Sequence, residues 1–312
     1  MIICVTPNPA IDRTLTVPQL RLGEPQRATE VFVAAGGKGL NVARVVQALG
    51  GAVVCAGFVG GYSGQLVAAL AEREGLPAMW TPIVGETRTC LIIIDPQAHD
   101  ATVINEPGPT VAADDWAHLA TQVVERAPAA AAICLSGSLP PGSSPADYAL
   151  MLRQVRATGC ALWVDTSGAA LRTAIEVGGL GIKVNGAEAG ELLGQAITQP
   201  GEALHAAHSL HRRTGAPVVL TLGSAGAVFV NEQGGWHAQP PEIQLVSSVG
   251  SGDAFLGGLV LALTHDAAPP TALCHAVAAG AANALEVGGG RLSHDHFHRL
   301  LASTTITAMR AD

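Results

Sequence analysis

The sequence predicts an α/β fold with a mostly parallel central sheet, helices on both faces and a small β-sheet lid. From about residue 112 onwards, short β-branched runs alternate with helical patterns, and the runs at 131–135 and 218–222 are apolar apart from Thr221. Strands that alternate with helices form parallel sheets, and wholly apolar strands are buried on both sides. Segments within about 12–33 and 79–105 interrupt the alternation, so we expect them to form the lid.

The composition excludes several classes of protein. The chain has 312 residues, of which 48% are hydrophobic and 13% charged, with no linker-like stretch, so we expect one domain over residues 1–312. The net charge of −8 argues against nucleic acid or an anionic membrane as a partner. The six cysteines form no C-x-x-C pair, so we expect neither a disulfide framework nor a metal site made of cysteines. Unpaired cysteines of this kind favour a protein of the reducing cytoplasm.

In the N-terminal part, the strands are short β-branched runs and the helices follow glycine-rich or polar turns. The first run ends at Thr6-Pro7-Asn8-Pro9, and the glycine-rich segment 36–39 precedes a helix. We predict strands at 2–6, 14–17, 28–33, 53–58, 89–95 and 101–105, and helices at 39–49 and 63–74.

In the C-terminal part, each helical pattern is followed by an apolar run until about residue 250, after which the pattern is helical only. We predict strands at 131–135, 161–165, 180–184, 217–222 and 243–246. The predicted helices are 112–126, 144–157, 168–176, 186–194, 201–213, 253–265, 270–285 and 293–302.

The stretch Gly250-Ser251-Gly252-Asp253 is the most informative one for chemistry. Its glycines allow a tight turn and leave the backbone N–H groups uncovered, and the helix that follows adds its partial positive charge. These parts form a site for an anion beside one carboxylate. Taken alone, the stretch favours a simpler interpretation, a glycine turn capped by an aspartate, and the rest of the chain decides between the two.

Several loops converge on the same site. Open parallel sheets bind ligands beyond the carboxyl ends of their strands, where the loops after 2–6, 131–135, 180–184 and 217–222 lie. Lys38 and Lys183, the two lysines of the chain, both stand in motif-like contexts. The sequence contains no P-loop, no third glycine of a dinucleotide motif and no G-x-S-x-G elbow.

Phosphoryl transfer to a hydroxyl suits the parts that remain. Its loose transition state needs positioning and charge neutralisation more than a strong base. We expect the helix N-terminus to keep the pKa of Asp253 low, which leaves a weak base that accepts the alcohol proton late in the reaction. The N–H groups at 250–253 would meet the charge that develops on the phosphoryl group.

Two segments, 36–44 (GGKGLNVAR within AGGKGLNVAR) and 249–253 (VGSGD), resemble the two signatures of the ribokinase-like sugar kinases. Within that group the chain is similar to the phosphofructokinase-B branch, because the segments 6–12, 85–88, 136–142 and 221–226 also match it in order. The branch holds 1-phosphofructokinase, tagatose-6-phosphate kinase and the minor 6-phosphofructokinase. The resemblance spans nearly the whole chain and implies a ribokinase-like fold.

The resemblance implies a role for each matching residue, with ATP and Mg²⁺ as cofactors. Asp253 resembles the catalytic base, and Gly250, Ser251 and Gly252 resemble the anion hole. The residues implied to bind the sugar phosphate are Asp12, Arg27, Gly37, Lys38, Asn41, Arg88 and Ser138. Those implied to bind ATP are Lys183, Asn185, Thr221, Gly223, Gly226 and Asn283, and those implied to hold Mg²⁺ through water are Asn185 and Glu188.

Simpler interpretations stand beside these roles. Lys38 could be a solvated loop lysine, Asp12 a turn cap, Arg88 a charge on the lid surface and Glu188 a first-turn acid of a helix. Two positions depart from the family pattern. Val184 stands where the family usually has proline, and Ser247 stands where several members have an aspartate beside a monovalent cation, which leaves potassium binding open.

The sequence therefore predicts an ATP-dependent kinase that converts fructose 1-phosphate or fructose 6-phosphate to the bisphosphate. Tagatose 6-phosphate is the alternative substrate. A kinase of an unphosphorylated sugar or nucleoside and a non-catalytic sensor of sugar phosphates are further alternatives, although the intact Asp253 argues against the sensor. The resemblance also implies a homodimer formed through the lid.

Overall fold

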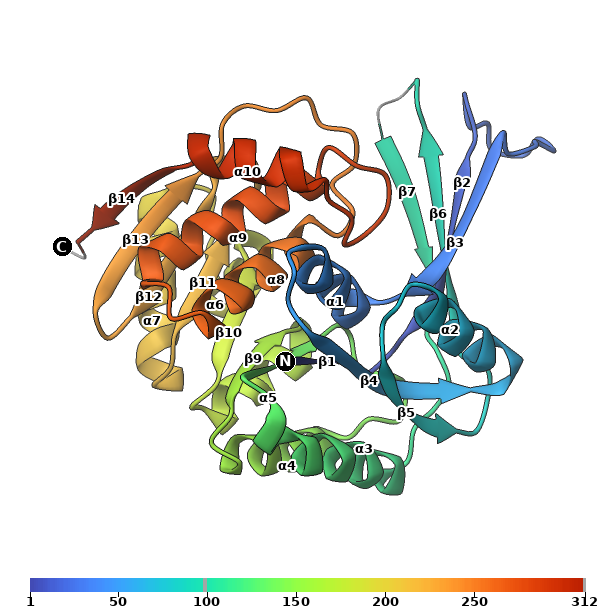
Figure 1. The fold of residues 1–312 in the computed structure, drawn as a ribbon, viewed down its shortest axis with the longest axis horizontal. Helices are drawn as coiled ribbons and strands as arrows, with labels where there is room; N and C mark the ends of the chain where they lie inside the picture. The colour runs from blue at the N-terminus through green and yellow to red at the C-terminus, as the bar shows by residue number, and fades with distance from the viewer. Residues whose placement is uncertain (98–99, 311–312) are drawn as a thin grey trace.

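Alternate residues of the first strand, β1 (Ile2–Thr6), face two different hydrophobic cores. Ile3 and Val5 pack into one core with residues of the helices drawn at the bottom of Figure 1, whereas Ile2 and Cys4 pack into the other with residues of helices on the opposite face. All four side chains are buried, as the period of two in a strand requires when helices cover both faces of a sheet. The computed structural model describes residues 1–97 and 100–310.

Within these residues, the large sheet has the strand order β14-β13-β12-β11-β10-β9-β8-β1-β4-β5. The strands from β11 to β5 in this order are parallel, and β12, β13 and β14 are added antiparallel at one edge. The further strands of this sheet are β4 (Val53–Gly60), β5 (Ala78–Ile83), β8 (Ala132–Ser136), β9 (Ala161–Asp165), β10 (Gly181–Asn185), β11 (Val218–Thr221), β12 (Ala227–Asn231), β13 (Gly234–Gln239) and β14 (Thr305–Met309).

Helices cover both faces of this sheet (Figure 1). They are α1 (Lys38–Ala48), α2 (Gly61–Arg73), α3 (Ala113–Arg126), α4 (Pro145–Ala157), α5 (Gly168–Val177), α6 (Gly186–Leu193), α7 (Pro200–Thr214), α8 (Ser251–Thr264), α9 (Pro269–Asn283) and α10 (His294–Ser303), with short 3₁₀ turns η1 (Ala127–Ala129) and η2 (Gly223–Ala225). None of the helices in the described part of the chain combines the length and the apolar character that a membrane span requires.

A separate small sheet stands beside the large one, which confirms the predicted lid (Figure 1). Its order is β3-β2-β6-β7, formed by β2 (Ala10–Thr16), β3 (Glu30–Gly36), β6 (Arg88–Asp95) and β7 (Asp100–Asn105). Strands β2 and β6 are parallel, and their register sets Asp12 opposite Cys90. The start of β2 and the end of β3 join this sheet to β1 and α1, so Asp12 and Lys38 lie where the two sheets meet.

The structure differs from the sequence predictions in three places: two predictions are wrong, and one group of strands was missed. Strand β5 belongs to the large sheet, pairing with β4, so residues 78–83 are not part of the lid. Residues 243–246 form no strand, because the N–H of Val246 bonds to the carbonyl of Ala284 and not to a neighbouring strand. The antiparallel strands β12, β13 and β14 were not predicted. β14 follows the last helix and is mostly exposed, so it lacks the apolar pattern of a buried strand.

Candidate active site

The Gly-Ser-Gly-Asp turn lies at the start of α8, at the edge where the parallel strands end. Gly250 precedes the helix with φ of +81°, a conformation that side chains disfavour. A Cβ atom there would lie 2.4 Å from the Cα atom of Gly289, and a Cβ atom on Gly252 would lie 2.8 Å from Nζ of Lys183. Gly250 is therefore needed for the close approach to Gly289, and the ammonium of Lys183 lies against the backbone of the turn at Gly252.

Asp253 lies in the first turn of α8 and is 5% exposed. Its Oδ2 accepts a hydrogen bond from Nδ2 of Asn41 at 2.8 Å. Burial raises the pKa of Asp253 to about 6, the charge of Lys38 opposes that rise and the charge of Asp165 adds to it. The prediction of a low pKa is therefore wrong: the helix N-terminus does not offset complete burial beside a second carboxylate.

Asp165, which the sequence analysis missed, joins the two lysines. It is fully buried at the end of β9, where Oδ1 accepts from Nζ of Lys38 at 3.0 Å and Oδ2 from Nζ of Lys183 at 2.9 Å. Burial alone would raise its pKa, but the two ammonium groups outweigh burial and lower it. A carboxylate at the carboxyl end of a predicted parallel strand was the signal that could have found it.

Lys38 begins α1 and bonds to one carboxylate oxygen of Asp165, whereas Lys183 bonds to the other. Its side chain is 39% exposed, so the ammonium is in reach of a ligand. Burial opposes its charge, yet the carboxylates of Asp165, Asp253 and Glu188 raise the pKa of Lys38 above its usual value. Lys38 therefore stays charged at neutral pH, and the group of Asp165, Asp253 and the two lysines carries balanced charge.

A cavity of about 650 Å³ opens between the lid and the carboxyl edge of the large sheet. It brings together residues from seven separate parts of the sequence. Of the predicted site residues, those that line it are Asp12, Gly37, Lys38, Asn41, Arg88, Ser138, Gly250 and Asp253. Burial raises the pKa of Asp12 to about 6, although the charges of Arg44 and Arg88 oppose that rise. The cavity thus contains two carboxylates that ionise just below neutral pH.

Arg88 begins β6 and borders the cavity from the lid side. Its Nε and Nη2 donate to the carbonyl of Asn8 at 3.2 and 3.1 Å, and Nη1 donates to Oδ1 of Asn105 at 3.1 Å. Within the described residues it forms no salt bridge, although its charge favours the ionised form of Asp12 in the same cavity. A guanidinium held in this way suits a phosphate.

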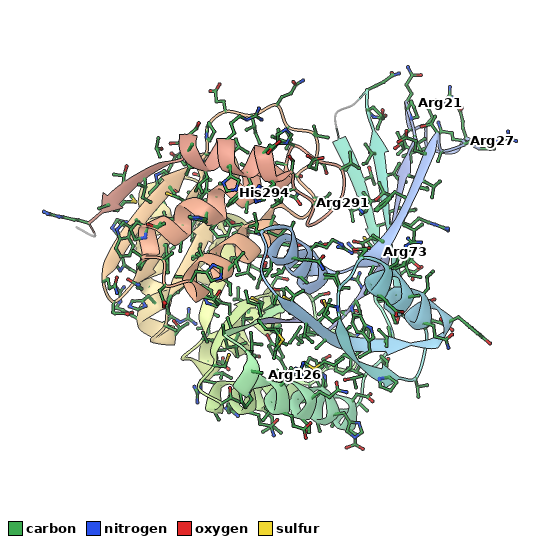
Figure 2. The ribbon with its side chains drawn as sticks, in the orientation of Figure 1. Arg21, Arg27, Arg73, Arg126, Arg291 and His294 are labelled. Atoms are coloured by element: carbon green, nitrogen blue, oxygen red, sulfur yellow. The ribbon has the colours of Figure 1, made fainter. Side chains whose placement is uncertain are left out.

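Arg27 is not brought to the cavity. It is an exposed residue of the loop between β2 and β3, and Figure 2 shows it at the tip of the lid, beyond the ends of the strands. The fold of one chain therefore supplies no contact between Arg27 and the other predicted substrate-binding residues.

The residues predicted to bind ATP and Mg²⁺ lie along the same edge of the large sheet, beyond β10 and β11. Asn185 and Glu188 form a reciprocal cap at the start of α6: Glu188 N donates to Asn185 Oδ1, and Asn185 N donates to Glu188 Oε2, both at 2.9 Å. Oε1 of Glu188 has no hydrogen-bond partner among the described residues. A carboxylate oxygen of this kind fits Mg²⁺, which prefers oxygen ligands and retains bound water.

Thr221 is the last residue of β11, and the loop between β11 and β12 contains Gly223 and Gly226. Gly226 has φ of +85°, and a Cβ atom there would lie 2.0 Å from the carbonyl of Ala238, so the close approach to β13 demands glycine. Thr221 and Gly223 remain accessible at the end of β11, where a nucleotide would lie in an open parallel sheet.

Asn283 is buried behind the Gly-Ser-Gly-Asp turn. Its Nδ2 donates to the carbonyl of Val249 at 2.8 Å, and its Oδ1 accepts from the backbone N–H of Arg291 at 3.0 Å. Asn283 therefore fastens the turn to the loop that follows α9, and this contact accounts for its burial.

Known proteins share this fold and these segments. A family model described as pfkB family carbohydrate kinase matches residues 3–295. The 1-phosphofructokinase of Xanthomonas campestris pv. campestris is 34% identical over 269 residues, covering 85% of this chain and 85% of the relative. The tagatose-6-phosphate kinase of Staphylococcus epidermidis is 31% identical over 303 residues, covering 96% of this chain and 97% of the relative.

The solved structure of phosphofructokinase-2 from Escherichia coli in complex with potassium superimposes with a TM-score of 0.91 at 29% identity, covering 97% of this chain and 98% of that one. Fold, family model and relatives agree with the resemblance seen in the two signature segments. The chain is an enzyme and belongs to the pfkB family of carbohydrate kinases.

Proposed function

We propose that this enzyme transfers the γ-phosphoryl group of ATP to a ketohexose that already contains a phosphate, fructose 1-phosphate or fructose 6-phosphate, and releases the bisphosphate. One observation supports the proposal most: a single cavity contains a carboxylate suited to sugar hydroxyls, an arginine that forms no salt bridge within the described residues, and the buried Asp253 beside the glycine turn. The similarity to a 1-phosphofructokinase and a tagatose-6-phosphate kinase supports the same class of substrate.

At the sugar end, we infer that Asp12 accepts hydrogen bonds from hydroxyl groups while Arg88 binds the phosphate that the substrate brings. A sugar without a phosphate would leave the Arg88 charge without an anionic partner. Ser138 and the glycine at 37 lie on the same cavity wall and would contact the sugar. Arg27 has no part in this proposal for a single chain.

At the reacting end, Asp253 accepts the proton of the attacking hydroxyl. The N–H groups of the turn at 250–253 face the phosphoryl oxygens, and the charges of Lys38 and Lys183 offset the negative charge gathered there. Because the pKa of Asp253 is about 6, it is ionised at neutral pH yet is a stronger base than an exposed aspartate.

We propose that ATP lies beyond β10 and β11, against Thr221 and Gly223, and that Glu188 holds Mg²⁺ through water. The metal would supply charge neutralisation on the phosphates, as in other phosphoryl transfers. A monovalent cation such as K⁺, held by Ser247 and the backbone around it, is a further part of the proposal. It predicts a higher initial rate of ADP release in K⁺ buffer than in Na⁺ buffer.

We further propose a homodimer formed through the lid. The small sheet exposes large apolar side chains, among them Val31, Phe32, Val103 and Ile104. Exposed apolar patches of this kind mark interaction surfaces. Sedimentation equilibrium measures the assembly state, and a monomer at micromolar concentration would contradict the proposal.

The decisive test of function is ADP release in a panel of acceptors: fructose 1-phosphate, fructose 6-phosphate, tagatose 6-phosphate, and the free sugars and nucleosides. We expect the highest kcat/KM for one of the fructose phosphates. Preference for tagatose 6-phosphate would change the substrate but keep the mechanism. Turnover of unphosphorylated acceptors alone would refute the proposed substrate class, and no turnover at all would favour the sensor.

Replacement of Arg88 by glutamine tests the phosphate subsite. We expect KM for the sugar phosphate to rise about 10- to 100-fold with a smaller change in kcat, because a charge-assisted hydrogen bond to phosphate is lost. Arg13→Gln is the matched control, since Arg13 is exposed on the adjacent strand β2 and does not line the cavity. Equal KM values for the two variants would remove Arg88 from substrate binding.

The pH dependence of kcat/KM tests the ionisation of the two cavity carboxylates. Both need to be ionised and both have a pKa of about 6, so activity should fall as pH drops through 6 with a slope that approaches two. Asp12→Asn should remove one of these two ionisations and reduce the slope with the same substrate. Full activity retained at pH 5 would contradict the ionisation that burial imposes.

A further inference from the structure

Arg44 is a buried residue of α1 that lies behind the wall of the cavity and does not line it. Its Nη1 donates to Oδ1 of Asn41 at 2.7 Å and lies 3.5 Å from the carbonyl of Gly289. Its Nη2 donates to the carbonyl of Ala35, and its Nε forms a salt bridge with Glu74. All three nitrogens of the guanidinium thus have hydrogen-bond or salt-bridge partners. One of these partners is Asn41, which in turn donates a hydrogen bond to Asp253.

The side-chain amide of Asn41 can satisfy its neighbours in only one orientation. Arg44 can only donate, and the ionised carboxylate of Asp253 can only accept. Oδ1 of Asn41 must therefore face Arg44, and Nδ2 must face Asp253, 2.8 Å away. The amide also packs closely against Gly289, since a Cβ atom there would lie 2.6 Å from Nδ2 of Asn41. The two orientations of the amide fill the same space, so its hydrogen-bond partners select between them.

We propose that Arg44 is a positioning residue for phosphoryl transfer: it fixes the amide of Asn41 so that Nδ2 donates to Asp253. The inference rests on the proposed function, in which Asp253 is the base. Without Arg44, the amide is free to rotate by half a turn, and its oxygen would then face the carboxylate of Asp253. That orientation removes a hydrogen bond that favours the ionised base and replaces it with repulsion between oxygens.

The same guanidinium acts on Asp12 through its charge. Burial raises the pKa of Asp12. Of the groups that lower this pKa, Arg44 has the largest effect through its charge, followed by the charge of Arg88 and a hydrogen bond with the thiol of Cys90. Glu74 forms a salt bridge with Nε of Arg44 and partly neutralises its charge, and the side chain of Glu74 is 19% exposed. Arg44 thus supports both cavity carboxylates from outside the cavity.

The other charged groups that face Asp253 are Lys38 from α1, Asp165 from the end of β9 and Lys183 from β10. Lys38 and Lys183 are both bonded to Asp165, and none of the three contacts Arg44. Replacing Arg44 therefore leaves these influences in place. A change in the ionisation of Asp253 in such a variant reports on the path through Asn41.

The test compares Arg44→Met and Arg44→Lys with the wild type by ¹³C NMR titration of the aspartate carboxyl groups, with the signal of Asp253 assigned from Asp253→Asn. In Arg44→Met we expect the proton affinity of Asp253 to rise about tenfold, a shift of about one pH unit. The acid limb of kcat should move upward by the same amount. Lysine keeps the charge but not the planar fork, so the pKa of Asp253 in Arg44→Lys should lie between the values in the wild type and in Arg44→Met.

Two controls separate positioning from stability. In an Asn41→Ala background, replacing Arg44 should no longer shift the titration of Asp253, because the path between them is gone. Arg156→Met removes an arginine that donates to the carbonyls of Val177 and Gly178, away from the cavity, and should change stability alone.

If wild type and Arg44 variants titrate alike, and only the melting temperature changes, the proposal is overturned. If Arg44→Met does not fold, the comparison rests on Arg44→Lys: an Asp253 titration identical to that of the wild type overturns the proposal. The NMR measurement needs no turnover, so failure of the proposed function appears separately, as a folded protein that phosphorylates none of the acceptors.

Discussion

Asp253→Asn should lower kcat by a factor on the order of 10²–10⁴ while leaving ATP affinity nearly unchanged. Asparagine has the shape of aspartate but cannot accept the proton of the attacking hydroxyl. The glycine turn and the two lysines remain, so the phosphates keep their contacts. Single-turnover kinetics for the chemical step and calorimetry for ATP binding measure the two effects separately.

The stability of the same variant provides an independent check. Burial raises the folded-state pKa of Asp253 from 3.8 to about 6, so the folded protein binds this proton more tightly than the unfolded chain does. The carboxylate therefore destabilises the fold increasingly as pH rises from about 4 to 6, and at pH 7 the full cost is present. Asp253→Asn should melt above the wild type at pH 7 and lose that advantage below pH 4. A variant with unchanged turnover would remove Asp253 from the mechanism.

Asp165→Asn should reduce the free energy of unfolding by about 3–5 kcal/mol at pH 7, because it leaves buried ammonium groups without their carboxylate. Lys183 is the more affected partner, since its side chain is 5% exposed against 39% for Lys38. Urea unfolding followed by the fluorescence of the four tryptophans measures the loss. Catalysis should fall as well, because both lysines lose the group that positions them.

The sign of the pH dependence distinguishes this effect from general damage. The two lysines hold the pKa of Asp165 below 3.8, so its stabilising contribution is present at neutral pH and disappears as pH falls through the lowered pKa. The wild type and Asp165→Asn should therefore converge in stability in strong acid. Adding Lys38→Met to Asp165→Asn should recover part of the loss by removing one orphaned charge. A loss independent of pH would contradict the ion-pair explanation.

The parallel sheet and the lid could be predicted because their signals are local. Mainly apolar runs such as 131–135 and 218–222 favour burial between two layers of helices, which the structure confirms. The antiparallel edge was missed because β14, near the end of the chain, is mostly exposed and pairs with β13, which lies about 70 residues earlier. Nothing within a short window of the sequence specifies such a pairing.

The candidate site was predictable to the extent that it consists of motifs. The Gly-Ser-Gly-Asp turn and the glycine-rich start of α1 were identified from their spacing, and the fold brings Lys38 and Asp253 to one cavity. Asp165 belongs to neither motif, so its role depends on two lysines that come from different parts of the chain. Arg44 lies within a motif, but its importance follows from the contact between Asn41 and Asp253, 212 residues apart.

By itself, the sequence determined the α/β architecture, the positions of the glycines in the turn before Asp253, and the family to which the chain belongs. Backbone conformation and hydrophobic pattern are local properties, so they can be inferred from neighbouring residues. Only the tertiary structure decided the ionisation of the cavity carboxylates. Burial raises the pKa of Asp253 although it begins a helix, and two lysines lower the pKa of the equally buried Asp165. Proton affinity depends on which charges and how much water surround a group in space, and the folded chain alone fixes both.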